Sequence, residues 1–185
     1  MSQDGDEGLL AVPPSTQDHR QGSLNAVVVL VLYGDYQSPQ SADVYRLVKV
    51  MQRQLSASSG EDYLCLVFRH FPQRQLHAQA QRAAEAAEAA ADQGRFWQMH
   101  DMLFNHQQEL GNGYLVEYAN RLELDISRFL QAMSGHRHID RINQDIESGL
   151  NSGVAKAPAL FINGNRYVDR WSMDGLMAAI ATAGH

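Results

Sequence analysis

Residues 38–41 are Ser-Pro-Gln-Ser and place two hydroxyl groups three residues apart at the start of a predicted helix. Serine is a preferred N-cap residue and proline suits the first helical position, so Ser38 and Pro39 indicate where that helix begins. A serine hydroxyl becomes a nucleophile only beside a general base that a third group orients. The sequence has no Gly-x-Ser-x-Gly motif, and no histidine or aspartate is identifiably paired with Ser38 or Ser41. We therefore interpret the pair first as helix-capping residues.

The remaining side chains that could do chemistry give weaker signals. The single cysteine, Cys65, lies in an apolar strand pattern, where a free cysteine usually acts as a small hydrophobic residue. Among the eight histidines, His136 and His138 would not share a helix face, while His70 and His77 flank a turn. Neither of the latter two has a cysteine or carboxylate at a recognisable ligand spacing, so we predict no metal site. A solvated helix face is expected to carry Arg82, Glu85 and Glu88.

The elements around residues 38–41 form a strand–helix–strand unit. Residues 26–33 are a continuous, largely β-branched run, which is typical of a strand buried on both faces. An amphipathic helix follows Ser38 and ends near Gly60, and residues 63–68 give a second buried strand. The rest of the chain is predicted as helices at 76–93, 96–107, 114–122, 125–133 and 139–150, strands at 159–162 and 166–168 around an Asn163-Gly164 turn, and a last helix capped by Ser172.

Composition and charge limit the class of protein. The chain has 185 residues, 44% of them apolar, and a net charge of −6, which suits one folded domain. The acidic balance argues against nucleic acid or an anionic membrane as the main partner. The longest apolar run, residues 26–33, is too short to span a bilayer. We predict a loose leader over residues 1–25 with no visible secretory signal, and hence a cytoplasmic protein, or a periplasmic one if a leader was removed.

Several segments in collinear order carry a resemblance to a known family. They are Asp-His-Arg-Gln-Gly at 18–22, Tyr-Gly-Asp-Tyr-Gln-Ser-Pro-Gln-Ser at 33–41, Arg-His-Phe-Pro at 69–72, His77, Ala-Ala-Glu-Ala-Ala around Glu85, Gln-Gly-Arg-Phe-Trp-Gln-Met-His-Asp at 93–101, and residues 153–164. Over about residues 18–182 the chain resembles the DsbA-like oxidoreductases. The resemblance implies an α/β thioredoxin fold, βαβ followed by ββα, with a helical insertion at about 76–152 in a single domain of residues 26–185.

In that family the motif Cys-Pro-x-Cys opens the first helix, and here Ser38 and Ser41 stand at both cysteine positions. Thiol–disulfide exchange requires a thiolate, so the resemblance implies the family's fold without its redox reaction. It also implies a cis peptide bond before Pro158, facing the helix start. The exposed backbone of Ala157 would then pair with an extended peptide in a groove that Pro39 and Gln40 also line. Alternatively, Pro158 only shapes the turn into the following strand.

Three interpretations of function follow. The first is a redox-inactive module that binds a peptide or partner protein in the old substrate groove, without a cofactor. The second is an enzyme that binds glutathione, because Ser38-Pro39-Gln40-Ser41 also resembles the Ser-Pro-x-Ser segment of kappa-class glutathione transferases, where a serine hydroxyl contacts the cofactor's thiolate. The third is a Cys→Ser form of an active disulfide oxidoreductase. The sequence leaves the identity of the partner and the oligomeric state open.

Overall fold

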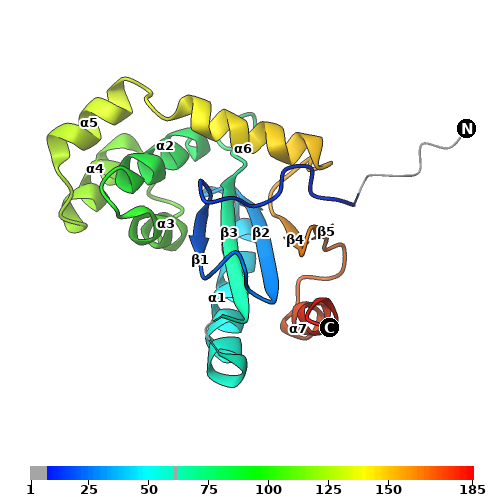
Figure 1. The fold of residues 1–185 in the computed structure, drawn as a ribbon. Coiled ribbons are helices and arrows are strands. Elements are labelled where there is room, and N and C mark those ends of the chain that lie inside the picture. Colours follow the sequence, from blue (N-terminus) through cyan, green and yellow to red (C-terminus); the bar gives the residue numbers. More distant parts are fainter. Residues whose placement is uncertain (1–7, 61) are drawn as a thin grey trace, which may run out of the picture.

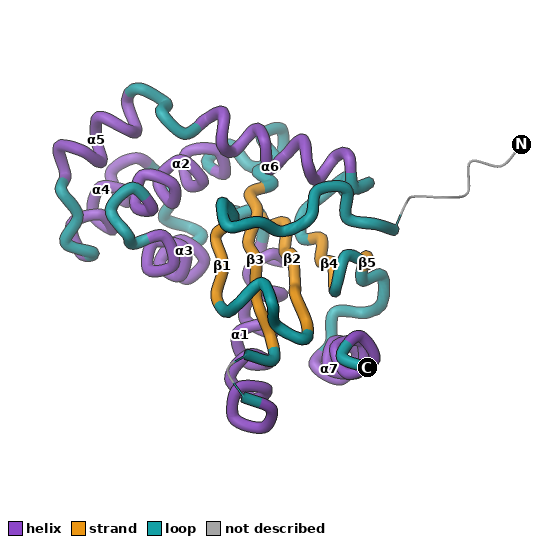
Figure 2. Tube along the Cα trace, viewed as in Figure 1, coloured by secondary structure: helices purple, strands orange, loops and turns teal. Residues whose placement is uncertain are grey.

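A five-stranded mixed sheet forms the centre of the structure, a computed structural model that describes residues 8–60 and 62–185 (Figures 1 and 2). The strand order is β1-β3-β2-β4-β5, with β2 and β3 parallel and the other neighbouring pairs antiparallel. The strands are β1 (His19–Gln21), β2 (Val28–Gly34), β3 (Leu64–His70), β4 (Ala159–Ile162) and β5 (Asn165–Arg166). The expected βαβ–ββα order of the thioredoxin fold is therefore present.

The helices pack against one face, one end and one edge of this sheet (Figure 1). α1 (Pro39–Ser59) connects β2 to β3, and α7 (Met173–Ala183) follows β5 and contacts α1. The expected helical insertion lies between β3 and β4, with α6 crossing one end of the sheet and α2–α5 gathered beside β1 (Figure 1). Its members are α2 (Ala80–Ala91), α3 (Phe96–Asn105), α4 (Asn112–Arg121), α5 (Ile126–Ser134) and α6 (Ile139–Asn151).

The strands β2 and β3 are buried on both faces, as their continuous apolar runs predict. On one face, Leu30 and Leu32 join the large core that α1, α7 and the helical insertion share. On the other face, Val31, Tyr33 and Cys65 join a second core that includes Phe71 and Phe161. Successive side chains of a strand point to opposite faces, so one apolar run supplies both cores.

Local capping signals place the helix and hairpin boundaries close to their predicted positions. Ser38 is the N-cap of α1, and Ser172 is the N-cap of α7, where its side chain accepts a hydrogen bond from the Gly175 amide. Asn163 and Gly164 both adopt left-handed conformations, with φ of 47° and 82°, as a tight hairpin turn requires. The second hairpin strand is shorter than the predicted 166–168, because the chain leaves the sheet after Tyr167.

The N-terminal segment differs most from its prediction. We predicted a loose leader over residues 1–25, but residues 19–21 form β1, which pairs with β3, while residues 1–7 lie outside the described residues. The segment is held by a buried ion pair in which Arg69 Nε and Nη2 donate to the two carboxylate oxygens of Asp18 at 2.9 and 3.1 Å. Arg69 also donates to the backbone carbonyls of Val12 and Pro13. These contacts join residues about fifty positions apart, so local patterns could not reveal them.

The Asp18–Arg69 pair predicts an acid-dependent loss of stability. Burial alone would raise the pKa of Asp18, but hydrogen bonds from Arg69 and the Ser15 amide outweigh it and lower that pKa. The folded pKa lies below the unfolded value of about 3.9, so the stabilisation is present above roughly pH 4 and is lost as pH falls through the folded pKa. Urea unfolding of the wild type between pH 5 and pH 2 should show this loss. The Asp18→Asn variant should lack the part of this pH-dependent loss that Asp18 contributes. An equal change in the free energy of unfolding with pH in both proteins would contradict the prediction.

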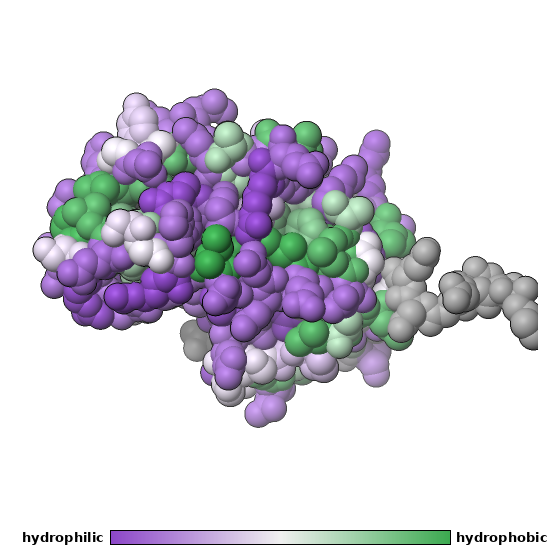
Figure 3. Space-filling view, turned by 90° about the horizontal axis from the view of Figure 1, so that it is seen from above, coloured by the Kyte–Doolittle hydropathy of each residue, from purple (hydrophilic) through white to green (hydrophobic). Residues whose placement is uncertain are grey.

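The surface of the described residues is mainly hydrophilic, with separate hydrophobic areas rather than one continuous face in the view from above (Figure 3). Large apolar side chains that remain exposed include Leu9, Val12, Leu150 and Val168. None of the described helices combines the length and the apolar character that a membrane crossing needs.

Candidate functional site

The two serines of residues 38–41 lie at the junction of β2 and α1, and both are buried, with 4% and 0% of their surface exposed. Ser38 Oγ accepts a hydrogen bond from the Ser41 amide at 3.2 Å, which is the expected N-cap contact. Ser41 Oγ in turn accepts from the Asp35 amide at 3.2 Å. Both hydroxyl oxygens therefore satisfy backbone groups at the helix start, while Pro39 and Gln40 between them are exposed.

Asp35 organises this junction, a role that the sequence interpretation missed. Its buried carboxylate accepts hydrogen bonds from the amides of Gln37 and Gln73 at 2.8 and 2.9 Å and from His77 Nδ1 at 2.7 Å. The Asp35–His77 pair lies beside both serines. The Ser38 amide donates to the Asp35 carbonyl at 3.1 Å, and the Asp35 amide donates to Ser41 Oγ. Within the described part of the chain no hydrogen bond joins His77 to either serine. The nucleophile–base–orienter arrangement of a hydrolase is therefore incomplete.

Two glutamines fix the loops around the helix start. Gln107, which follows α3, donates from Nε2 to the carbonyls of Tyr36 and Ser38 at 2.8 Å each. The Gln37 side chain accepts from the Gln79 amide at 2.9 Å. Contacts of this kind cross between the thioredoxin-like half and the helical insertion, so the insertion holds the site in place.

The peptide bond between Ala157 and Pro158 is cis, as the resemblance implied. We predicted an exposed backbone at Ala157, but this residue is 3% exposed, because its amide donates to Gln73 Oε1 at 3.2 Å inside the protein. The backbone amide of Gln73 donates to the Asp35 carboxylate, so Gln73 links the start of α1 to the Pro158 segment. The structure thus brings together the two predicted parts of the site through Gln73, which the sequence interpretation did not single out.

A surface groove of about 350 Å³ begins at Pro158. It continues along Tyr167, Val168 and Trp171, and the charged residues Arg166 and Asp169 also line it. A larger groove of about 750 Å³ between β5 and α7 shares Tyr167 and Val168 with it. The side chain of Val168 is 81% exposed at the meeting point of the two grooves. The groove beside Pro158 therefore presents both charged and apolar side chains.

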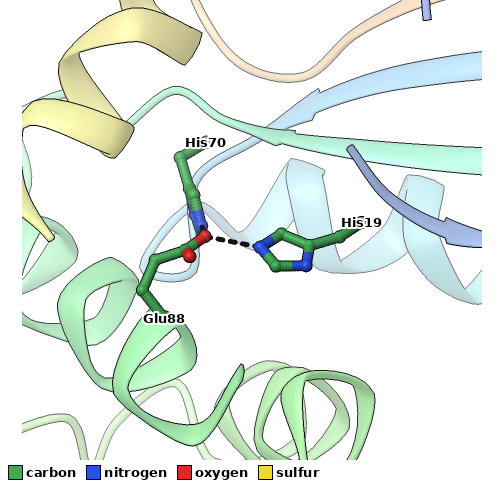
Figure 4. Close-up of side chains that lie close together, drawn as sticks. All are labelled: His19, His70 and Glu88. Atoms are coloured by element: carbon green, nitrogen blue, oxygen red, sulfur yellow. Dashed lines mark hydrogen bonds and ion pairs between the residues drawn. The ribbon is translucent and has the colours of Figure 1, made fainter. Parts of the chain in front are cut away.

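A second polar cluster joins three elements of the described structure, and the prediction of a solvated face for Glu85 and Glu88 is wrong. Glu88 is 5% exposed, and its Oε1 accepts from Nε2 of His19 at 2.6 Å and Nε2 of His70 at 2.7 Å (Figure 4). These hydrogen bonds outweigh burial, which alone would raise the pKa of Glu88, and hold that pKa well below its usual range. Glu85 is buried in the same helix against Arg82 and His136. Small alanines surround both carboxylates and let neighbouring elements close over them.

Cys65 lies within β3 and is fully buried, which confirms its predicted role as a core residue. Burial raises the pKa of its thiol. A reactive cysteine needs a lowered pKa and access to solvent, and Cys65 has neither.

The fold and the junction at residues 38–41 define a thioredoxin-like domain, and the chain belongs to the thioredoxin family, whose model matches residues 15–182. Among solved structures, oxidised BdbD from Bacillus subtilis is similar with a TM-score of 0.79 and 16% identity, covering 95% of this chain and 98% of that one. α-DsbA1 from Wolbachia pipientis is similar with a TM-score of 0.76 and 18% identity, covering 92% of each chain. The fold is thus DsbA-like, with the helical insertion of these structures.

Curated relatives of higher identity are much longer proteins. The chain is 38% identical over 177 residues to a protein named Na(+)/H(+) antiporter NhaA 3 from Salinispora tropica, covering 95% of this chain and 26% of that protein. It is 35% identical over 149 residues to a protein named Na(+)/H(+) antiporter NhaA from Herminiimonas arsenicoxydans, covering 80% and 23%. The chain therefore spans about a quarter of the length of these relatives.

Proposed function

We propose that this chain is a redox-inactive, DsbA-like binding module that holds an extended protein segment beside Pro158. The observation that carries the proposal is a DsbA-like fold with serines at residues 38 and 41, where the resemblance to the Cys-Pro-x-Cys motif would place cysteines. The Ser38 hydroxyl caps the helix and the Ser41 hydroxyl accepts from the Asp35 amide, so both oxygens are bonded to the backbone. The scaffold therefore retains its surface for peptides without the groups that would react with them.

The chemistry of hydroxyl groups excludes the family's reaction at this site. Exchange proceeds by attack of a thiolate on a disulfide sulfur through a mixed disulfide. A helix N-terminus stabilises a nearby anion by at most about 2 kcal/mol, whereas one pKa unit corresponds to roughly 1.4 kcal/mol. The helix start can therefore move the pKa of an alcohol by only a unit or two, which leaves it protonated at neutral pH.

Binding of an extended segment would use the backbone at Ala157 and the groove that begins at Pro158. A peptide strand could pair with the Ala157 amide once the Gln73 side chain has moved aside, because main-chain pairing gives such complexes their affinity. Apolar side chains of the peptide would then lie against Val168 and Trp171. In the free protein Gln73 Oε1 accepts from the Ala157 amide, so it would compete with a bound peptide for this donor.

The partner we favour is a segment of an ion antiporter. The similar longer proteins are named Na(+)/H(+) antiporters, and this chain corresponds to about a quarter of their length. When a binding module and its peptide segment belong to one chain, the effective concentration of the peptide is high. Even a weak binding site would then be occupied.

Substitution of Gln73 should strengthen peptide binding. In the Gln73→Ala variant the Ala157 amide loses its internal acceptor, while the Gln73 backbone contact to Asp35 is kept. A typical hydrogen bond contributes about 0.5–1.5 kcal/mol net, so we expect affinity to rise about two- to tenfold. The measurement is an NMR titration of the ¹⁵N-labelled chain with reduced, carbamidomethylated ribonuclease A, an unfolded probe without free thiols. Shifts are expected at residues 37–41, 73 and 157.

The Gln131→Ala variant is the matched control, because Gln131 is an exposed glutamine on α5, away from this groove. It should bind the probe with wild-type affinity. No shifts at these residues in either the wild type or Gln73→Ala would overturn the proposal. Saturable shifts at Ser38 with millimolar glutathione, without any response to the unfolded protein, would replace it with the glutathione-binding alternative.

A further inference from the structure

Three side chains from three different elements converge at the edge of the sheet where β1 meets the helical insertion. His19 comes from β1, His70 from the end of β3 and Glu88 from α2, and both rings point at the carboxylate (Figure 4). Their ligand atoms, Nε2 of each histidine and the Glu88 carboxylate oxygen, all lie within 4.8 Å of one another. The cluster lies outside residues 35–41 and takes no part in the proposed peptide groove.

The buried charge of Glu88 requires a compensating positive charge in contact with it. A buried carboxylate is costly unless it is paired with a positive charge. Among residues 8–60 and 62–185, the ion-pair contacts of Glu88 are with His19 and His70 alone, and Arg141 acts on it only from beyond ion-pair distance. A positive charge in direct contact with this carboxylate must therefore be either a proton on an imidazole or a bound cation.

The surrounding residues hold the three ligands in place before any ion arrives. The His19 ring stacks on Phe96 with 3.5 Å between centroids and 7° between planes. The His70 ring packs edge-on against Phe68 and Phe96, and its backbone amide donates to Asp145 at 2.9 Å. His19 remains partly exposed, with 17% of its side chain accessible, so solvent can reach the cluster from that side. Pre-positioned ligands with an access route are what a metal site needs.

We propose that His19, His70 and Glu88 bind a divalent zinc-like cation, with water as a fourth ligand. Two imidazole nitrogens and one carboxylate oxygen form a three-ligand set that Zn²⁺ accepts at about 2.0–2.1 Å. The present 2.6–2.7 Å contacts are hydrogen-bond distances, so binding requires the ligand atoms to move apart to about 3.3 Å, the edge of a tetrahedron of that size. Each neutral ring would carry its proton on Nδ1, which frees the Nε2 lone pair for the metal.

The role that follows is structural. β1 has three residues and pairs with one neighbour, so it is a weakly held edge strand. A cation shared by His19, His70 and Glu88 would fasten it to β3 and to α2 at once. Because binding free energy at such a site adds to folding free energy, zinc should raise the melting temperature of the metal-free protein.

The test is titration of the chelator-treated, ¹⁵N-labelled chain with ZnSO₄, followed by calorimetry and by NMR of the histidine ring nitrogens. We expect saturable binding, a higher melting temperature, and large shifts of the Nε2 signals of His19 and His70. His19→Phe keeps a ring stacked on Phe96. Loss of a residue that only orients a metal ligand lowers metal affinity by up to about a hundredfold, so loss of the ligand itself should weaken zinc binding by at least roughly that factor. Glu88→Gln is a second variant with little change in shape and should lose binding similarly.

His138→Phe is the matched control. His138 also contacts a carboxylate at 2.7 Å, that of Asp92, and its side chain is 15% exposed, close to the 17% of His19. It lies outside the cluster and should leave zinc affinity unchanged. The proposal is overturned if zinc leaves the ring nitrogens of His19 and His70 unshifted, including the case where zinc binds elsewhere. It is also overturned if His138→Phe loses binding while His19→Phe keeps it.

Discussion

The Ser38→Cys/Ser41→Cys double variant is expected to catalyse thiol–disulfide exchange, which the proposed function excludes for the wild-type chain. The thiol introduced at position 38 would stand at the N-terminus of α1, where helix dipole and backbone amides lower a thiol pKa. A shift from about 8.5 to about 6.5 would raise the thiolate fraction at pH 7 from about 3% to about 76%, roughly 25-fold. Insulin reduction by dithiothreitol should therefore be accelerated by the double variant, whereas the wild type should match dithiothreitol alone.

The same helix offers a matched dithiol control. Ser56 and Ser59 have the same spacing of three residues and lie exposed at the C-terminal end of α1. The Ser56→Cys/Ser59→Cys variant has an equal number of thiols, and more exposed ones, but they lie at the negative end of the helix dipole, so it should give little acceleration. Equal rates for the two double variants would contradict the view that the junction at residues 38–41 remains a competent exchange site.

The Arg69→Met variant is expected to show the largest loss of stability. Arg69 is buried and donates to Asp18, to Tyr33 Oη and to two backbone carbonyls of the N-terminal segment. Methionine fills similar volume but leaves the Asp18 carboxylate buried without its partner, which typically costs about 3–5 kcal/mol. Urea unfolding monitored by circular dichroism should report a decrease of that size in the free energy of unfolding.

Two further variants separate the charge from the packing. The Arg46→Met variant removes an exposed ion pair, in which the side chains of Arg46 and Asp43 are 55% and 72% exposed. The free energy of unfolding should therefore change by less than about 1 kcal/mol. In the Asp18→Leu/Arg69→Met double variant no charge is left unpaired, and much of the loss should be recovered. A single Arg69→Met variant as stable as the wild type would show that this pair does not hold the N-terminal segment.

The elements that could be predicted from the sequence are those with local signals. β2 follows from a continuous β-branched run, α1 from the Ser38-Pro39 cap, and the β4–β5 turn from Asn163-Gly164. β1 could not be predicted, because His-Arg-Gln has neither alternation nor apolar character. It exists through pairing with β3 and through contacts between distant residues, which no short window of sequence contains.

The candidate sites show the same division. Ser38, Ser41 and Pro158 could be singled out because a collinear family pattern marks their positions, and the cis bond before Pro158 is confirmed. Asp35, Gln73 and His77 could not be joined by inspection, since 38 and 42 positions separate Asp35 from its two partners. Glu88 was misinterpreted because a charged residue in an alanine-rich helix usually faces solvent. Here it is enclosed because His19 of β1 and His70 of β3 both bond to its carboxylate.

The interior position of Cys65 has a consequence for the conditions under which this domain can fold. The sequence has no second cysteine, and the one thiol is buried with a raised pKa. No cross-link therefore contributes to the folded state, and the thiolate needed for modification by glutathione or oxidants is suppressed. The free energy of unfolding should be equal in a reducing glutathione buffer and in an oxidising one. A chain built on the scaffold of redox enzymes thus has a folding equilibrium that is independent of the surrounding redox potential.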